Sequence, residues 1–158
     1  MSRKLVAVFS ATGTTLKTAE ELAEAENAQL YEIRAQKPYS AADLDWMDKS
    51  SRSTVEMKDA AARPALADHD APVAEAAVIF VGYPIWWNEA PRVVDTFLES
   101  YDFSGKTIVP FATSGGSSIT NSEKRIRNLV PSAHLREGLL MNHHVSEEVL
   151  KEWADQFK

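Results

Sequence analysis

Hydroxyl side chains are concentrated in one short loop near the start of the chain. Ser10, Thr12, Thr14 and Thr15 surround Gly13, and the loop lies between an apolar run and a helical pattern. Backbone N–H groups at a helix start, hydroxyl donors and the positive end of the helix dipole together suit a phosphate monoester. The loop contains no lysine or arginine, so a phosphate here would depend on uncharged donors. Helix capping is the simpler use of the same hydroxyl groups.

A second loop carries two adjacent tryptophans, Trp86 and Trp87, directly after another apolar run. We expect this loop, with Pro84 and Ile85, to place aromatic rings in a pocket at a strand end. Stacking on an aromatic side chain contributes about 1 to 3 kcal/mol for a nucleobase, and any flat heterocycle should gain a similar amount. The alternative is that one tryptophan packs in the core while the other lies at the surface.

A third loop consists of small residues, with Thr113, Ser114, Gly115 and Gly116 following a third apolar run. Because glycine has no side chain, the backbone N–H groups of this loop can approach a planar ligand closely. A plain strand-to-helix turn capped by a following serine is the alternative. Taken together, the three loops predict a site for a flat heterocycle that carries a terminal phosphate.

Several other chemistries are excluded or disfavoured by the residues present. The P-loop and the G-x-G-x-x-G dinucleotide motif are both absent. The chain has no cysteine, which excludes disulfides, thiolate nucleophiles and cysteine-ligated metals. His143 and His144 stand close to Glu147 and Glu148, which could suggest a metal site. We interpret the histidines as loop residues and the glutamates as favourable charges at a helix start.

The elements that must position these loops alternate between strand and helix patterns. Short apolar runs predict buried strands, an alternating run that ends before Pro38 predicts a strand near the sheet edge, and apolar stripes at helical spacing predict helices. This order is typical of an α/β fold with a doubly wound parallel sheet, in which ligands bind at the carboxyl ends of the strands. The expected strands are residues 4–9, 30–34, 76–82, 107–113 and 133–140, and the expected helices are residues 15–27, 91–101, 116–129 and 146–157.

Residues 39–71 are the least regular part of the chain. A helical pattern extends over residues 41–60, and Arg63 with Pro64 indicates a turn. Arg52 and Glu56 form an i, i+4 pair that we interpret as surface structure. We expect this segment to cover the sheet beside the predicted pocket.

Length and charge restrict the classes of protein that fit. The 158 residues suit one domain, and the net charge of −6 disfavours nucleic-acid binding. The chain has no apolar stretch of membrane-spanning length and begins almost directly with a strand pattern, so we expect a cytoplasmic protein that binds no membrane. A monomer or a homodimer would suit this composition.

The motifs jointly resemble the flavodoxin-like family, and in particular a bacterial branch with the sequence G-Y-P-I-W-W at residues 82–87. The likeness continues through A-P at residues 90–91, F-L-E at 97–99 and G-K-T-I-V-P-F-A-T-S-G-G-S at 105–117. The resemblance implies one three-layer α/β/α domain over residues 1–158, with a five-stranded sheet of order 2-1-3-4-5. It also implies non-covalent FMN, with Ser10, Thr12, Gly13, Thr14 and Thr15 at the phosphate and Pro84, Ile85, Trp86, Trp87, Thr113, Ser114, Gly115 and Gly116 beside the isoalloxazine ring.

The function implied by the resemblance is electron transfer between a flavodoxin reductase, or a similar enzyme, and other redox proteins. An FMN-dependent NAD(P)H:quinone or flavin oxidoreductase is the alternative, although no nicotinamide motif is visible. A flavodoxin-fold interaction protein without cofactor is a third, which the intact hydroxyl and glycine loops disfavour. Asn88 stands where this branch usually has glycine beside a backbone peptide that can flip near the flavin, and asparagine tolerates positive φ better than most residues.

Overall fold

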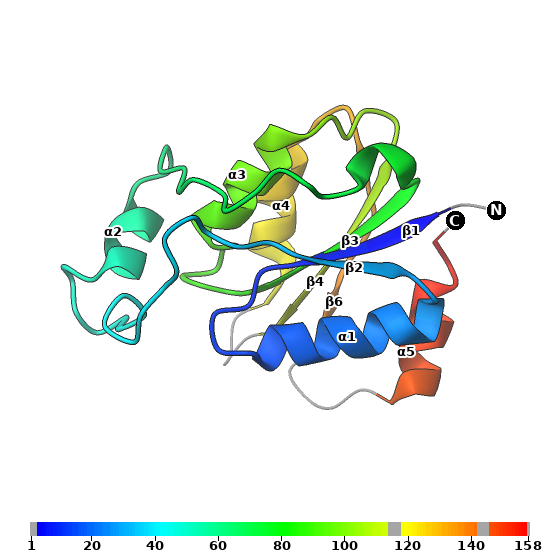
Figure 1. Ribbon diagram of the computed structural model, residues 1–158, viewed down its shortest axis with the longest axis horizontal. Coiled ribbons are helices and arrows are strands. Elements are labelled where there is room, and N and C mark those ends of the chain that lie inside the picture. Colours follow the sequence, from blue (N-terminus) through cyan, green and yellow to red (C-terminus); the bar gives the residue numbers. More distant parts are fainter. Residues whose placement is uncertain (1–2, 114–117, 142–145, 158) are drawn as a thin grey trace.

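The computed structural model describes residues 3–113, 118–141 and 146–157 as a parallel sheet with helices on both faces (Figure 1). The strand order is β2-β1-β3-β4-β5, and β6 also pairs with β4, which confirms the predicted order 2-1-3-4-5. The strands are β1 (Lys4–Val8), β2 (Gln29–Glu32), β3 (Val78–Pro84), β4 (Thr107–Thr113), β5 (His134–Leu135) and β6 (Leu139–Leu140), and the helices are α1 (Thr14–Glu26), α2 (Arg52–Lys58), α3 (Arg92–Ser100), α4 (Thr120–Leu129) and α5 (Glu147–Ala154), with a short 3-10 turn at Val73–Glu75.

Strand β1 lies inside the sheet, and its register aligns the strand ends that lead into the predicted loops. Leu5 is paired with Gln29 of β2 on one side and with Ile79 of β3 on the other. Pro84 of β3 is paired with Thr113 of β4. Because all these pairs are parallel, the carboxyl ends of the strands meet at one edge, where the first two loops begin.

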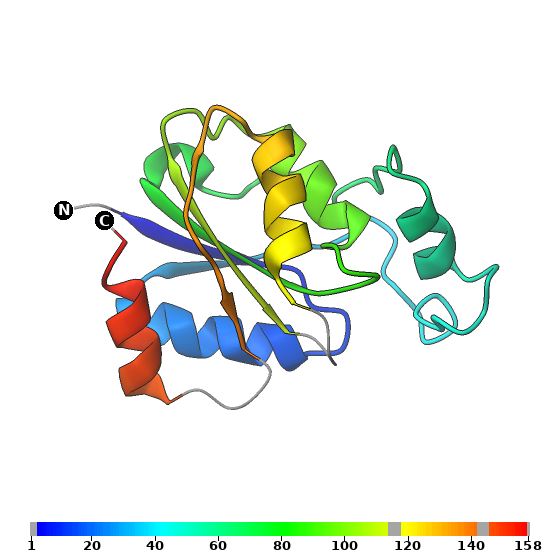
Figure 2. The same cartoon turned by 180° about the vertical axis from the view of Figure 1, so that it is seen from behind.

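Apolar side chains from the two faces of the sheet enter separate cores. Val6 and Val8 of β1 pack with α1 and α5, while Leu5 and Ala7 belong to the core under α3 and α4. Figures 1 and 2 show α1 with α5 on one face of the sheet and α3 with α4 on the other. The three-layer α/β/α arrangement predicted from the sequence is therefore confirmed.

The predicted fifth strand, residues 133–140, is wrong as a single element, because β5 and β6 are two short strands beside β4. The break lies opposite Pro110 of β4. The Arg136 amide donates to the Ile108 carbonyl at 2.9 Å, but the next ladder bond would need an amide hydrogen that Pro110 lacks. The Gly138 amide instead donates to Glu123 Oε2 of α4 at 2.6 Å. A Cβ atom at Gly138 would lie 2.3 Å from the Pro110 carbonyl oxygen.

The helix predicted over residues 41–60 is reduced to α2, and residues 41–50 form turns and irregular backbone. Aspartate and serine side chains of the turns bond to nearby backbone amides, which competes with helix formation. Asp45 Oδ1 accepts from the Met47 amide at 3.1 Å, and Asp48 Oδ1 accepts from the Ser50 amide at 2.9 Å. Ser51 then caps α2 by accepting from the Thr54 amide.

We call residues 39–71 the excursion, because this segment leaves the sheet between β2 and β3 and returns to it. In Figure 1 it extends past the end of the molecule where α1 begins, on the side opposite the two termini. Among the described residues, no helix is both long enough and apolar enough to span a lipid bilayer.

Candidate functional site

The loops after β1 and β3 come together beside the end of β4 at the carboxyl edge of the sheet. The Thr15 hydroxyl, in the first turn of α1, lies 2.8 Å from the Thr113 hydroxyl at the end of β4. The Ile85 amide donates to the Thr113 carbonyl at 2.9 Å, which joins the aromatic loop to the same point. Thr113 therefore connects both neighbouring loops.

A cavity of about 360 Å³ opens at this junction. Most of its described lining was predicted from the sequence, but Ala11 of the first loop, Leu44 of the excursion and Met141 after β6 were not. Leu44 lies in a turn-rich segment that the sequence pattern predicted as helix, so no local signal placed its side chain at the cavity. The lining residues are Ala11, Thr12, Thr14, Thr15, Leu44, Pro84, Ile85, Trp86, Thr113 and Met141.

The other six predicted residues divide into three groups. Ser10 and Gly13 shape the first loop without lining the cavity, and the Ser10 hydroxyl accepts from the Gly13 amide at 3.0 Å. Trp87 lines a neighbouring cavity instead. Ser114, Gly115 and Gly116 lie outside the described residues.

The first loop leaves the start of α1 open for an anion. Gly13 adopts a φ of 94°, in the left-handed region that favours glycine. No side chain caps the described N-terminus of α1. Thr12 and Thr14 both line the cavity, and the first-turn amides of α1 have no side-chain acceptor among the described residues. The capping alternative is not supported at this helix.

The aromatic loop forms a tight two-residue turn. The Trp86 amide donates to the Glu89 carbonyl at 2.8 Å, and the Glu89 amide donates back at 3.0 Å. Trp87 has a φ of 48° and Asn88 a φ of 65°, the sign pattern of a type I′ turn. Asn88 therefore adopts the positive φ that asparagine tolerates better than most residues. Asn121 Nδ2 of α4 donates to the Asn88 carbonyl at 3.1 Å and holds the turn from outside.

The two tryptophans have different surroundings. Trp86 is half-buried, and its ring makes edge contacts with Phe9 and Tyr39 at centroid distances of 5.9 and 5.6 Å. Trp87 is 44% exposed and has the left-handed backbone that is unfavourable for a bulky residue. Such strain, of order 1 to 3 kcal/mol, persists only where neighbouring contacts impose it. Of the two residues, Trp86 packs on the core and also lines the cavity, while Trp87 does neither.

Tyr39 connects Trp86 to the excursion. Its hydroxyl donates to Glu56 Oε1 at 2.5 Å, and the Arg52 guanidinium lies 3.9 Å from its ring centroid. Burial and the bond to Glu56 raise the pKa of Tyr39, so the phenol stays protonated. Arg52 also donates to Glu56 Oε2 at 2.8 Å. The Arg52–Glu56 pair predicted as surface structure is therefore partly buried and supports the aromatic wall.

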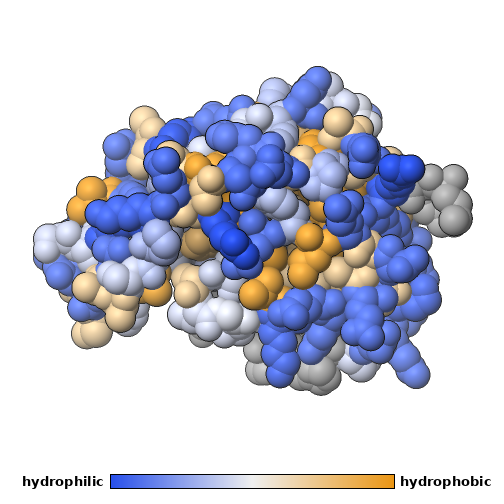
Figure 3. All heavy atoms as spheres, viewed as in Figure 1, coloured by the Kyte–Doolittle hydropathy of each residue, from blue (hydrophilic) through white to orange (hydrophobic). Residues whose placement is uncertain are grey.

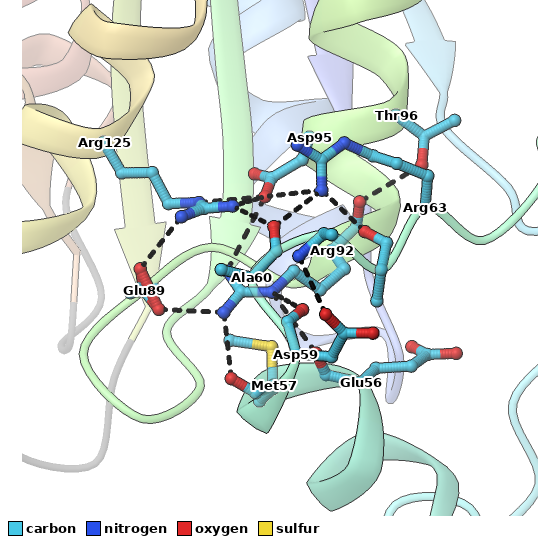
Figure 4. A network of polar contacts seen from close by, with 12 residues as sticks. Glu56, Met57, Asp59, Ala60, Arg63, Glu89, Arg92, Asp95, Thr96 and Arg125 are labelled. Atoms are coloured by element: carbon cyan, nitrogen blue, oxygen red, sulfur yellow. Dashed lines mark hydrogen bonds and ion pairs between the residues drawn. The ribbon is translucent and has the colours of Figure 1, made fainter.

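A buried network of charged groups attaches the excursion to α3 and α4 (Figure 4). Arg92, only 2% exposed, donates through Nη2 to the Met57 carbonyl at 2.8 Å and to Glu89 Oε1 at 3.1 Å. Its Nε donates to the Asp59 carbonyl at 3.1 Å. These bonds satisfy carbonyl groups at the end of α2, where the Asp59 carbonyl also accepts from the Ala62 amide at 3.0 Å. The same arginine therefore holds both α2 and the residue that closes the tryptophan turn.

Asp95 is the buried acceptor of this network. Arg125 donates to Asp95 Oδ2 through Nε at 2.9 Å, and Arg125 Nη2 also donates to the Ala60 carbonyl at 2.8 Å. Burial raises the pKa of Asp95, although the neighbouring arginines oppose that shift. Among the described residues, Asp95 Oδ1 and Arg92 Nη1 have no hydrogen-bond partner, so the network is incompletely satisfied there. The sequence analysis did not identify this network, because the fold brings together residues 57–60, 89–95 and 125 from separate parts of the chain.

Within the described ranges, no group of acidic or histidine side chains could hold a metal ion. His143 and His144 lie outside those ranges.

A family model of flavodoxins matches residues 3–157. The chain belongs to the flavodoxin family. This membership confirms the resemblance to the flavodoxin-like family, while the narrower bacterial branch with G-Y-P-I-W-W stays a prediction. No curated protein matched the chain.

Solved structures agree with the family assignment. A candidate flavoprotein from Bacteroides uniformis ATCC 8492 is 51% identical over 98% of both chains, with a TM-score of 0.92. A candidate flavoprotein from Bacteroides eggerthii DSM 20697 is 47% identical over 99% of this chain and 98% of the other, with a TM-score of 0.94. A flavoprotein from Lactobacillus acidophilus NCFM, solved in complex with FMN, shares the fold at 16% identity, with a TM-score of 0.73 over 98% of this chain and 99% of the other.

Proposed function

We propose that this flavodoxin-family chain binds FMN non-covalently and works as an electron-transfer protein between a reductase and other redox partners. The observation that carries the proposal is one cavity lined both by the hydroxyl loop and by Trp86. Membership of the flavodoxin family supports it, and so does the FMN complex of the Lactobacillus relative.

The residues present fit FMN at both ends of the molecule. Thr12, Thr14 and Thr15 supply hydroxyls next to the uncapped start of α1, where a phosphate dianion interacts favourably with the helix dipole. Trp86 offers a flat aromatic surface, and Leu44 adds an apolar one that excludes water. When bound, the flavin supplies the redox chemistry, and these residues bind and orient it.

Electron transfer suits the cavity better than acid–base catalysis does. None of the described lining residues titrates near neutral pH: they are alanine, threonine, aliphatic, proline, tryptophan and methionine side chains. Neither this cavity nor the one beside Trp87 has a described arginine or lysine in its wall that could hold the diphosphate of a nicotinamide dinucleotide. The described wall can therefore hold a cofactor, but it offers neither a side chain that titrates near neutral pH nor a cation.

Removing cavity hydroxyls should weaken FMN binding. Because a hydrogen bond to a charged group contributes about 1.5 to 3 kcal/mol, Thr12→Ala and Thr14→Ala should each raise the dissociation constant about tenfold or more. Titration of the apoprotein with FMN, followed by flavin fluorescence, measures this. Thr18→Ala is the matched control, because Thr18 lies one turn further along α1 and does not line the cavity. Equal affinity in all three variants would contradict the phosphate assignment.

The carrier and reductase functions differ in what the purified holoprotein does alone. A carrier should leave NADH and NADPH unoxidised with a quinone acceptor present, and should be reduced only when a separate reductase is added. Steady oxidation of either nucleotide by the protein alone would favour the oxidoreductase alternative.

A further inference from the structure

A second cavity, of about 380 Å³, lies next to the proposed FMN cavity and shares part of its wall. Leu44, Ile85 and Trp86 line both. The remaining wall comes from Trp87 of the tight turn and from Trp46 and Ser53 of the excursion. None of the hydroxyl-loop residues belongs to it, so the two cavities differ in chemistry.

Indole rings dominate this second cavity. Trp46 is 70% exposed and Trp87 is 44% exposed, although tryptophan is usually well buried. Apolar residues reach the surface of the excursion on the face shown in Figure 3. A cavity of this volume with mostly aromatic and aliphatic walls and few polar groups is typical of small-molecule sites. Its occupant should be flat, since three tryptophan side chains bound it.

One polar group in the wall has no partner in the part of the chain that the structure describes. Ser53 is 2% exposed, and its Oγ forms no hydrogen bond. Its neighbours behave differently, because the Ser51 hydroxyl donates to the Thr54 hydroxyl at 2.9 Å. A buried hydroxyl without a partner is unfavourable. Because Ser53 lines the cavity, rotation of its side chain toward the cavity would let a ligand oxygen satisfy the hydroxyl.

The described wall contains no charged side chain, which disfavours an ionic ligand because its charge would lose water without gaining a partner. We propose that this cavity binds a flat, uncharged aromatic molecule with a ring carbonyl, which is the chemistry of a quinone, and that the Ser53 hydroxyl donates to that carbonyl. The ligand would be a small-molecule redox partner of the bound flavin. This proposal rests on the assignment of the neighbouring cavity to FMN.

The test uses the oxidised holoprotein and menadione, an uncharged naphthoquinone, in titration calorimetry. Trp46→Ala should weaken menadione binding about tenfold or more, since one stacking surface is removed. Met47→Ala is the matched control, because Met47 is the next residue, is 75% exposed and does not line the cavity. Neither substitution should change the visible flavin spectrum or the affinity for FMN.

The role of the hydroxyl has its own variant. Ser53→Ala should weaken menadione binding roughly fivefold, which corresponds to one neutral hydrogen bond. Ser50→Ala is its control, because Ser50 is exposed and its hydroxyl already donates to Asp48. Unchanged affinity in Ser53→Ala would remove the carbonyl from the proposed ligand chemistry.

Other outcomes would overturn the proposal in distinguishable ways. A protein that binds no FMN, as its visible spectrum would show before menadione is added, would fail the proposed function itself. A holoprotein that retains FMN but binds no menadione would refute only the second site. Displacement of FMN by menadione would assign the second cavity to the flavin ring. Naphthalene sulfonate that binds as tightly as menadione would refute the uncharged ligand class. So would NADH, if it binds more tightly than menadione and Trp46→Ala weakens that binding.

Discussion

The sheet edge and the excursion form opposite walls of the site, and different forces hold them. Strands β1, β3 and β4 are buried between two apolar cores. The excursion has few apolar anchors: its buried residues are Ser51, Ser53, Thr54, Met57, Leu66 and Ala71. Its attachment depends on guanidinium groups that bond to carbonyl oxygens at the end of α2.

Because different forces hold the two walls, they should respond differently to amino-acid substitutions. Apolar burial is non-directional, so many side chains of similar volume can maintain the sheet. A buried ionic network depends on specific partners, because each uncompensated charge or carbonyl is costly. We therefore expect the site to lose the excursion wall before it loses the sheet wall.

Arg92→Met should have the largest effect. The substitution leaves Asp95 without one of its cations, removes the side-chain donor of the Met57 carbonyl and takes one of two donors from the Asp59 carbonyl. The free energy of unfolding should therefore fall by about 3 to 5 kcal/mol. Denaturant unfolding measures the loss, and hydrogen exchange should show the amides of α2 opening before those of β3.

Two further variants sharpen this result. Arg125→Met should cost less, because Arg125 is 21% exposed and water can replace part of its role. Arg34→Met is the control, because Arg34 forms only an exposed pair with Glu32 and should change stability by less than about 1 kcal/mol. If the amides of α2 and β3 in Arg92→Met exchanged together, the excursion would not unfold independently of the sheet, and the comparison would fail.

Gly82→Ala tests the sheet wall and should have an intermediate effect. A Cβ atom at Gly82 of β3 would lie 2.2 Å from Cζ of the Phe111 ring on β4. Overpacking of this kind costs about 1 to 3 kcal/mol. Thermal unfolding should detect it, and Phe111→Leu in the same chain should recover part of the loss. Selective opening of the excursion in Gly82→Ala would contradict the comparison.

Tyr83→Phe should have the smallest effect at neutral pH and a clear one in alkali. Burial raises the pKa of Tyr83 above its ordinary value of 10.0. The folded protein then keeps a proton that the unfolded chain loses above pH 10. Stability from this residue is fully present below pH 10 and falls by about 1.4 kcal/mol per pH unit above it.

The measurement for Tyr83→Phe is denaturant unfolding between pH 9 and 11, where the variant should lose stability less steeply than the parent. At neutral pH only the bond between the Tyr83 and Ser122 hydroxyls is lost, at about 1 kcal/mol. An unchanged alkaline slope would show that Tyr83 ionises in the folded protein.

Prediction from sequence succeeded where a local pattern reports burial. The apolar runs at residues 4–9 and 107–113 are strands, and the hydroxyl loop does precede a helix at the sheet edge. It failed where side chains compete with the helix pattern, as Asp45 and Asp48 do before α2. It also missed the break opposite Pro110, because the pairing partner of that proline is known only once the sheet is assembled.

The sequence by itself determined the alternation of strands and helices, the loops that follow β1 and β3, and the resemblance to the flavodoxin family. These follow from periodicity, turn residues and motif spacing, which are local. The folded structure was needed to show that Trp86 lines both cavities while Trp87 lines only the second, that Leu44 and Ser53 reach the cavities, and that Arg92 holds α2. Arg125 and Ala60 are 65 residues apart when they bond, and such pairings arise from the packing of whole elements rather than from any spacing along the chain.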